Sequence, residues 1–387
     1  MIDSYTLVIP TYNRSALLRR LVRYYRKRAP FINLLVLDSS RSEVQEENVK
    51  ALSQYGSAVR HVVYADNIQA SSKLADGLAL VETEYASLCA DDDVVFPEAL
   101  AESLMFLESH PDYACAHGLY LNFRQAGNDI HVFSEYSGPS NEAIHPGARV
   151  FRLLQRYESL YYGAFRTNDL REIVTVMQAM PSPLFRELFQ SVATVIKGKV
   201  KRFPSVYAAR QSGPPADPNR EKWQTCYWFA DNPREVLEHY ERYCDTLWKF
   251  YEDRASQRVE RAAFFKTLDL AHAVYFSAGC SADYFCSVLQ RYWPGDGLAN
   301  VGDANLLVEL GAPTAFTASS INKLLIRSWL LVRAVWSTPA VWRLDSEVRR
   351  ACTKPWKCHL SGSLRWLASA PEFRAGYLDL CNYLDAG

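Results

Sequence analysis

Short apolar runs and longer amphipathic stretches alternate along the first hundred residues. Four short apolar runs predict buried strands at residues 6–10, 32–40, 59–67 and 84–90. Apolar side chains recur every three or four positions across residues 15–28 and 74–81, which predicts two amphipathic helices, and a polar helix is predicted between them at residues 43–55. Strands that alternate with helices pair in parallel, so we expect an α/β fold with a doubly wound, mostly parallel, Rossmann-like sheet.

Polar side chains stand where these predicted strands end. Thr11, Asp38 and Asp66 follow the first three strands, and the run Asp91–Asp93 follows the fourth. Ligands bind open α/β sheets outside the carboxyl ends of the strands. We therefore expect these residues to border one binding cleft.

The stretch "SLCADDDVVFP" places three consecutive aspartates after a buried strand. Crowded carboxylates are costly unless a cation neutralises them, and hard oxygen ligands suit Mn²⁺ or Mg²⁺. The alternative is a solvated turn whose aspartate caps a helix that begins near Pro97. Neither GxxxxGK[ST] nor GxGxxG occurs, so we expect a phosphate to be held mainly through the metal.

The second half of the chain has a different pattern. A proline- and glycine-rich stretch at residues 211–221 predicts a boundary between a domain at 1–212 and a mostly helical domain at 213–387. Residues 319–368 carry nine Lys or Arg, two acidic residues and five Trp. Such a segment can lie on an anionic membrane surface or hold an anionic polysaccharide or lipid phosphate. The alternative is a packed helical subdomain with a solvated basic face.

Composition adds bounds on location and partners. Of 387 residues, 49% are apolar and the formal net charge is zero, so we expect a sizeable core and no nucleic-acid partner. The nine cysteines form no CxxC pair, which favours reduced thiols in the cytoplasm. We see no secretory signal in "MIDSYTLVIP" and no apolar run of about 18 residues. We expect a cytoplasmic protein, at most peripheral on the inner face of the membrane.

Three stretches, "LVIPTYNR", "VLDSS" and "CADDDVVFP", occur in this order over the first hundred residues. Their sequence resembles the nucleotide-diphospho-sugar domain of family-2-like glycosyltransferases with the GT-A fold, over about residues 1–210. The resemblance implies nucleoside contacts from the first two strand ends, and metal and donor-pyrophosphate contacts from the aspartates. The implied nucleoside residues are Pro10, Thr11, Tyr12, Arg14 and Asp38.

Within the aspartate run, the resemblance implies a metal-binding DxD motif at Asp91, Asp92 and Asp93. Many members of the family have an aspartate where this chain has Ala90. We expect Asp93 to bind the metal and Asp91 to be the ribose contact or a second ligand. Asp66 borders the nucleotide or makes a turn, and Lys73 approaches a phosphate or is a solvated helix lysine.

The resemblance also implies a catalytic base after the metal motif. "SPLFRELFQSVATVIKGKVKRFPSVYAAR" matches the family's order of helix, glycine, strand and arginine. Glu187 takes the acidic position, and Leu188 stands where an aspartate is expected. The alternative for Glu187 is an exposed glutamate paired with Arg186 or a lysine.

Other polar residues have weaker predictions. Tyr161 and Tyr162 stack on a sugar or pack in the core, and His117 and His145 are expected to be structural rather than metal ligands. The arginines of the first helix are expected to form a solvated face, namely Arg19, Arg20, Arg23 and Arg26.

The resulting hypothesis is a metal-dependent, inverting glycosyltransferase. It would move a sugar from a nucleotide sugar, with UDP expected, to a glycan, lipid-linked or protein acceptor. A nucleotidyltransferase is one alternative, although it would normally have a glycine-rich loop after the first strand and "PTYNR" has no glycine. A non-catalytic sugar-binding protein on a degenerate fold is the other, and Ala90 and Leu188 favour it.

Overall fold

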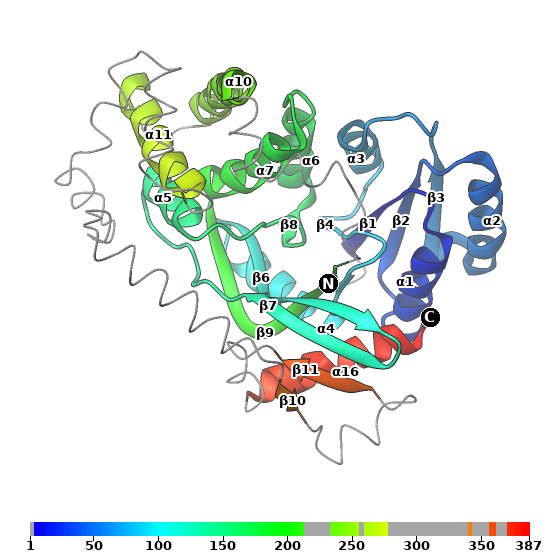
Figure 1. Cartoon of the computed structure of the whole chain (residues 1–387). Coiled ribbons are helices and arrows are strands. Elements are labelled where there is room, and N and C mark those ends of the chain that lie inside the picture. Colours follow the sequence, from blue (N-terminus) through cyan, green and yellow to red (C-terminus); the bar gives the residue numbers. More distant parts are fainter. Residues whose placement is uncertain (1–3, 213–232, 255–258, 278–339, 343–355, 361–369) are drawn as a thin grey trace.

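One large mixed sheet organises the molecule (Figure 1). The computed structural model describes residues 4–212, 233–254, 259–277, 340–342, 356–360 and 370–387. Their strands form an eleven-stranded sheet in the order β10-β11-β7-β6-β8-β4-β1-β2-β3, with β9 beside β6 and β5 beside β9. Helices pack on both faces, as the alternating pattern predicted.

The N-terminal part of the sheet is parallel. Its strands are β1 (Tyr5–Thr11), β2 (Asn33–Asp38), β3 (Val59–Val63) and β4 (Tyr85–Leu88). β1 is central, paired with β2 on one side and β4 on the other, and β3 pairs with β2. The predicted mostly parallel α/β sheet is thereby confirmed, and Thr11 lies opposite Asp38 at its carboxyl edge.

Alternation along β1 explains why helices cover both faces. Leu7 and Ile9 are buried in the core cluster that contains α1, whereas Val8 is buried in the cluster that contains α3. Successive strand side chains point to opposite faces, so a strand buried on both sides is apolar throughout. The connecting helices are α1 (Ser15–Arg28), α2 (Ser42–Leu52) and α3 (Ala70–Ala79), and a 3₁₀ turn (Ser53–Ala58) follows α2.

The other side of the sheet is mainly antiparallel. Its strands are β5 (Val94–Val95), β6 (Tyr113–Ala126), β7 (Asp129–Tyr136), β8 (Ala164–Arg166) and β9 (Lys199–Gln211). β8 joins β4 to β6 with antiparallel pairing on both sides, and β9 runs parallel to β6. The helices here are α4 (Pro97–Ser109), α5 (Pro146–Gln155), α6 (Thr167–Met177) and α7 (Pro183–Lys197).

The described C-terminal segments lie against this same sheet. The helices α10 (Pro233–Glu252) and α11 (Arg261–Ser277) contact α7 and α5 respectively. β11 (Lys357–Leu360) pairs parallel with β7, and β10 (Ala340–Trp342) pairs with β11. Strands therefore accompany the predicted C-terminal helices, and the domain boundary after residue 212 stays a prediction.

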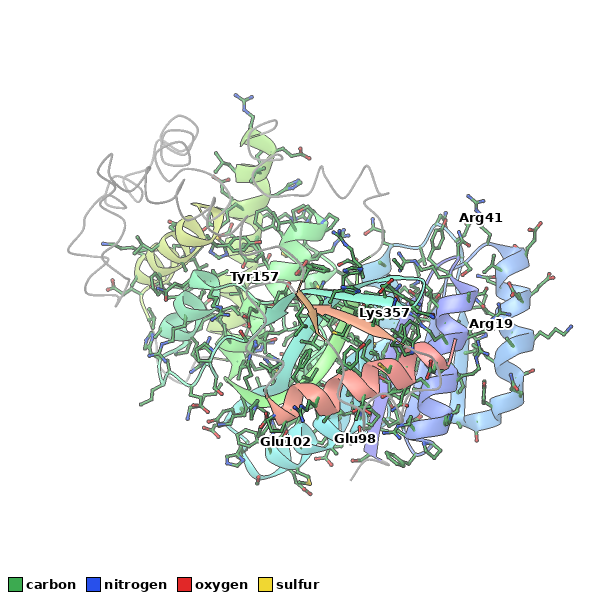
Figure 2. All side chains as sticks on the ribbon, turned by 60° about the horizontal axis from the view of Figure 1, so that its bottom comes forward. Arg19, Arg41, Glu98, Glu102, Tyr157 and Lys357 are labelled. Carbon is green, nitrogen blue, oxygen red and sulfur yellow. The ribbon has the colours of Figure 1, made fainter. Side chains whose placement is uncertain are left out.

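The last helix, α16 (Pro371–Asp385), returns to the N-terminal half. It contacts β9 and α1, and in Figure 2 it runs between Glu98 of α4 and Lys357 of β11. Arg28 of α1 reaches its Asp379 at 3.2 Å. The indole of Trp356, from the basic Trp-rich segment, is buried and donates to Asp385 at 2.9 Å.

Most of the basic, Trp-rich segment at residues 319–368 lies outside the described residues. Among the helices that the structure describes, none is long and apolar enough to cross a membrane.

Candidate active site

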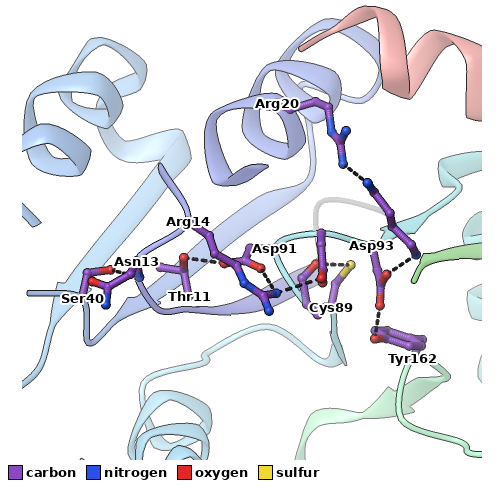
Figure 3. Close-up of polar contacts among 12 residues, drawn as sticks. Thr11, Asn13, Arg14, Arg20, Ser40, Cys89, Asp91, Asp93 and Tyr162 are labelled. Carbon is purple, nitrogen blue, oxygen red and sulfur yellow. Dashed lines mark hydrogen bonds and ion pairs between the residues drawn. The ribbon is translucent and has the colours of Figure 1, made fainter. Parts of the chain in front are cut away.

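The turn after β1 meets the aspartate loop that follows β4 (Figure 3). The hydroxyl of Thr11 donates to Asp91 Oδ2 at 2.6 Å. Arg14 Nη1 lies 3.1 Å from Asp91 Oδ1 and 2.8 Å from Asp92 Oδ2. Because β1 and β4 are parallel neighbours, their carboxyl ends bring these residues together. The predicted meeting of Thr11, Arg14 and the aspartates is observed.

A left-handed residue shapes this turn. Asn13 has a φ of 55°, which asparagine tolerates better than most residues. Its backbone N–H donates to Ser40 Oγ at 2.8 Å, and its side-chain oxygen accepts from the Arg41 N–H at 2.9 Å. The turn after β1 is thereby fixed to the turn after β2, where Asp38 lies.

Asp38 is fully buried and its two carboxylate oxygens are well supplied with partners. Oδ1 accepts from the Ser40 N–H at 2.8 Å; Oδ2 accepts from Asn48 Nδ2 at 2.8 Å and lies 3.1 Å from His61 Nε2. Burial alone raises the pKa of this carboxyl, but the hydrogen bonds from His61, Ser40 and Asn48 outweigh burial and hold the pKa well below its usual value. The group stays ionised.

Lys73 on α3 links the same two strand ends. Its side chain is only 3% exposed, so the alternative of a solvated helix lysine is wrong. The ammonium donates to the Thr11 carbonyl at 2.9 Å and to Ser39 Oγ at 2.7 Å. Burial lowers the pKa of Lys73, and the charges of Asp38 and Asp91 partly counter that effect. The positively charged Lys73 ammonium is therefore buried between the turn after β1 and the turn after β2.

The three consecutive aspartates have different surroundings. Burial raises the pKa of Asp91, although Thr11 and Arg14 act in the opposite direction. Burial and then the charge of Asp92 raise the pKa of Asp93 to about 7. The Asp92 side chain is the open one, 22% exposed against 3% for Asp91.

Asp93 points into the protein and not toward the open side of the loop. Its Oδ1 accepts from the Gln211 N–H at 2.6 Å, and its Oδ2 accepts from the Tyr162 hydroxyl. The whole residue is 6% exposed. Gln211 and Tyr162 hold Asp93 away from the open side of the loop, whereas Asp91 and Asp92 share the half-exposed Arg14. The geometry therefore disfavours the predicted assignment of Asp93 as metal ligand and favours Asp92, with Asp91 beside it. Tyr162 makes a polar contact in addition to its packing against Tyr161.

The loop is compatible with a cation that shares its ligands with a substrate. In the part of the chain that the structure describes, no three His, Cys, Asp or Glu side chains converge as a complete metal cage. Mg²⁺ sites that also hold phosphates commonly use one or two carboxylates, with phosphate and water completing the shell. Asp92 and Asp91 can supply that number, and they are crowded carboxylates whose nearest counter-charge is the half-exposed Arg14.

Glu187 lies in the first turns of α7 and is exposed. Ser182 caps this helix by accepting from the Phe185 N–H at 3.4 Å. The Tyr157 hydroxyl donates to Glu187 Oε1 at 3.3 Å. The alternative of a pair with Arg186 is wrong, because Arg186 donates to the Met180 carbonyl and to Gln69 Oε1.

Arg210, the arginine that ends the matched pattern, relates Glu187 to the aspartates. Burial lowers its pKa, but Tyr162, Tyr136, Asp93 and Glu187 together outweigh burial and raise it. Its Nη1 donates to the Tyr136 hydroxyl at 3.0 Å. Glu187 and Asp93 thus both contribute to raising the pKa of the same guanidinium.

The remaining predicted residues are peripheral to this cluster. Pro10 continues β1, Tyr12 is 47% exposed, and Asp66 is exposed in the turn after β3. No hydrogen bond or ion pair joins Asp66 to the cluster within the described ranges. His117 and His145 contact backbone groups, with His145 capping α5.

The sequence analysis missed two residues that support the loop from behind. The prediction of a solvated Arg20 is wrong, since it is 7% exposed and donates to Gln211 Oε1 at 2.6 Å (Figure 3). Arg20 also donates to the Tyr383 hydroxyl at 2.8 Å. Tyr383 of α16 in turn donates to the Asp92 carbonyl at 3.1 Å. Only the fold brings a residue this distant in sequence to the loop, so no local signal could have identified it.

Comparisons with known proteins concern the family and the fold. Residues 6–189 match the family model described as glycosyl transferase family 2. The structure of S. aureus TarS 1–349 in complex with UDP-GlcNAc is similar over 79% of this chain and 86% of that chain, with 12% identity and a TM-score of 0.51. The mannosyltransferase PcManGT from Pyrobaculum calidifontis, in complex with GDP-Man and Mn²⁺, is similar over 87% and 88%, with 11% identity and a TM-score of 0.42. No curated protein sequence matches.

The fold and the family match define a glycosyltransferase that uses a nucleotide sugar. Residues 6–189 are similar to glycosyl transferase family 2, and the fold is similar to that of glycosyltransferases such as TarS. Of the three functions that the sequence left open, transfer of a sugar is the one that these findings support.

Proposed function

We propose that this protein uses Mn²⁺ or Mg²⁺ to transfer a sugar from a UDP-sugar to a hydroxyl of a glycan, lipid-linked or protein acceptor, with inversion. The observation that carries the proposal is the meeting of Thr11, Arg14 and the Asp91–Asp93 loop at the carboxyl edge of the sheet. The UDP-GlcNAc complex of TarS supports UDP as the nucleotide. Membrane contact through residues 319–368 belongs to the same proposal.

Asp92 is the proposed metal ligand, with Asp91 as the second carboxylate. Asp92 is the open member of the run, whereas Asp93 is engaged by Tyr162 and Gln211. A divalent cation there would stabilise the charge on the leaving diphosphate. Lys73 and Arg14 supply positive charge on the same side, so the diphosphate would not depend on the metal alone.

Asp38 and the turn after β1 form the proposed nucleoside side of the cleft. Asp38 is ionised, fully buried and held by three donors, so it fixes the turn after β2 to which the turn after β1 is bound. Tyr12 is exposed beside it and offers an aromatic face for a base.

Glu187 is the proposed general base. A base must lie within hydrogen-bond reach of the hydroxyl whose proton it removes, and the exposed carboxylate of Glu187 is accessible to an acceptor. The Tyr157 hydroxyl orients its Oε1. Removal of the acceptor proton at Glu187 would let the acceptor oxygen displace the nucleotide in one step, which inverts the anomeric centre.

The experiment is a panel of nucleotide sugars, assayed for hydrolysis and transfer with Mn²⁺, with Mg²⁺ and with EDTA. Glu187→Gln should lower transfer by about 10²–10⁴-fold while UDP-sugar affinity stays unchanged. Glu46→Gln, an exposed glutamate on α2, is the matched control and should keep the wild-type rate. Transfer at the wild-type rate by Glu187→Gln would remove the base assignment, and no hydrolysis or binding of any nucleotide sugar would remove the proposed donor.

A further inference from the structure

A cavity of about 540 Å³ is lined by residues on either side of Tyr157, the hydroxyl donor to Glu187. It is bounded by β6, by the segment after β7 and by the ends of α5 and α7. Its polar lining includes His117, Ser140, Arg152, Arg156, Glu158 and Arg202. None of these residues has a part in the transfer proposed above.

The cavity wall contains a buried ion pair. Arg202 contacts Glu158, and their side chains are 7% and 8% exposed. Glu158 Oε1 also accepts from the N–H groups of Ser137 and Gly138, both at 3.0 Å, and lies 3.5 Å from Arg156 Nε. The single carboxylate is therefore already shared among several donors.

Arg202 has hydrogen-bonding capacity left over. Its Nε and Nη1 are buried and have no acceptor among the residues that the structure describes. A buried donor without an acceptor is unfavourable, and buried polar groups are nearly always paired with protein, water or a ligand. Burial lowers the pKa of Arg202, and the neighbouring charge of Arg156 acts in the same direction while Glu158 opposes it.

The charges that line the cavity do not balance. Arg152, Arg156 and Arg202 contribute three guanidinium groups, and Glu158 is the one carboxylate in the lining. His117 does not change this balance as a neutral imidazole, because burial and then the charge of Arg202 hold its pKa well below its usual value. An anion would supply the missing negative charge and the missing acceptors together.

Consecutive residues connect the cavity to the predicted base. Arg156 and Glu158 line the cavity, and Tyr157 between them donates to Glu187 Oε1 at 3.3 Å. Tyr157 is labelled in Figure 2. Likewise Tyr136, which contacts Arg210, immediately precedes the Ser137 N–H that binds Glu158. The segment 156–158 therefore contributes both to the lining of the cavity and to a contact with Glu187.

We propose that this cavity binds an anionic group, a phosphate or a carboxylate, carried by the acceptor. The inference rests on the proposed function and specifies its acceptor as an anionic glycan or phosphate-bearing chain. Guanidinium groups bind planar and tetrahedral oxyanions through paired N–H donors, which suits Arg152 and Arg156 at the open side and Arg202 at the wall.

Inorganic phosphate is the first probe, titrated calorimetrically into the full-length protein in EDTA with the nucleotide site filled by UDP. The test variant is Arg152→Gln/Arg156→Gln, since both residues are exposed while Arg202 is left to support the fold. Arg23→Gln/Arg60→Gln, at exposed positions on α1 and β3, controls for lost surface charge. We expect the test variant to bind phosphate at least about tenfold more weakly than the wild type and the control.

Failure of phosphate to bind the wild type, or equal binding by the test variant, would overturn the proposal. Donor hydrolysis is measured in parallel and should be the same in all three proteins. An absence of donor hydrolysis would count against the proposed function while the phosphate titration still reports on the cavity.

A second arm separates a phosphate on the acceptor from free phosphate as an effector. Transfer is measured with a phosphate-bearing and a neutral acceptor that offer the same hydroxyl. The test variant should raise KM about tenfold for the phosphate-bearing acceptor alone, and free phosphate should compete with it. Non-competitive inhibition or activation by free phosphate, or an equal KM change for both acceptors, would contradict acceptor recognition.

Discussion

Asp38 and the Asp91–Asp93 loop occupy the same edge of the sheet, after strands that flank β1 on either side. Asp38, Asp91 and Asp93 are all buried, yet the pKa of Asp38 is lowered whereas the pKa values of Asp91 and Asp93 are raised. Asp38 has donors from Ser40, Asn48 and His61. The loop has three carboxylates close together, with Arg14 as its direct ion-pair partner. Burial is common to both, so the supply of donors and counter-charge makes the difference.

This contrast separates a structural carboxylate from one that needs a further partner. The carboxylate of Asp38 already has its hydrogen-bond donors within the protein, so its loss should destabilise the fold. The aspartate loop is short of positive charge, and its loss should damage function.

Asp92→Asn should have the largest effect. Transfer should fall by about 10³-fold, because stabilisation of a leaving diphosphate by a metal is worth several kcal/mol. The midpoint of thermal unfolding should be unchanged, since the side chain is partly exposed and its removal relieves like-charge repulsion. Asp76→Asn, at an exposed position on α3, should leave both quantities as in the wild type. A stable Asp92→Asn protein with full activity would contradict the proposed role of Asp92 as a metal ligand.

Asp38→Ala should be the more damaging change for stability. Three buried donors would lose their acceptor, so urea denaturation should show a loss of about 3 kcal/mol in the free energy of unfolding. Asp66→Ala, at an exposed strand-end position, should change it by less than about 0.5 kcal/mol. Equal effects of the two substitutions would show that the hydrogen bonds to Asp38 do not stabilise the fold.

The pH dependence of the unfolding free energy should show the lowered pKa of Asp38. The pKa of Asp38 is lower in the folded protein than its ordinary value of 3.8, so its contribution to stability is present above that value. It is lost as the pH falls, when the unfolded chain takes up the proton first. The difference in unfolding free energy between wild type and Asp38→Asn should therefore shrink below about pH 4. A difference that stays constant from pH 6 to 3 would contradict the depressed pKa.

Tyr383→Phe should have the smallest effect. It removes the hydroxyl that donates to the Asp92 carbonyl and accepts from Arg20. We expect a loss of about 1 kcal/mol in the free energy of unfolding and a few-fold fall in transfer. Tyr24→Phe is the matched control, because the buried Tyr24 hydroxyl has no hydrogen-bond partner among the described residues. An equal fall in transfer for both variants would show that α16 does not position the loop.

The predictable part of the structure was local. α1 spans the predicted residues 15–28, because its boundaries and its apolar face are set by neighbouring residues. The strand ends that form the site were predictable for the same reason, since each polar residue directly follows an apolar run.

The rest depends on contacts between distant segments. Arg20 lies on the polar side of α1, but α16 covers that side and turns it into a buried polar layer. Lys73 becomes a site residue only because its helix starts beside two strand ends. The three adjacent aspartates lie in an irregular loop without helical or strand periodicity. The sequence therefore does not indicate which of them is exposed.

The binding of UDP as a function of metal tests the central claim most directly. Calorimetric titration of the wild type with UDP should show an affinity at least about tenfold higher in Mn²⁺ than in EDTA. Asp92→Asn should show the same low affinity under both conditions. Equal affinity of the wild type with Mn²⁺ and with EDTA, or a full metal-dependent gain in Asp92→Asn, would contradict the assignment of the aspartate loop as a metal–diphosphate site.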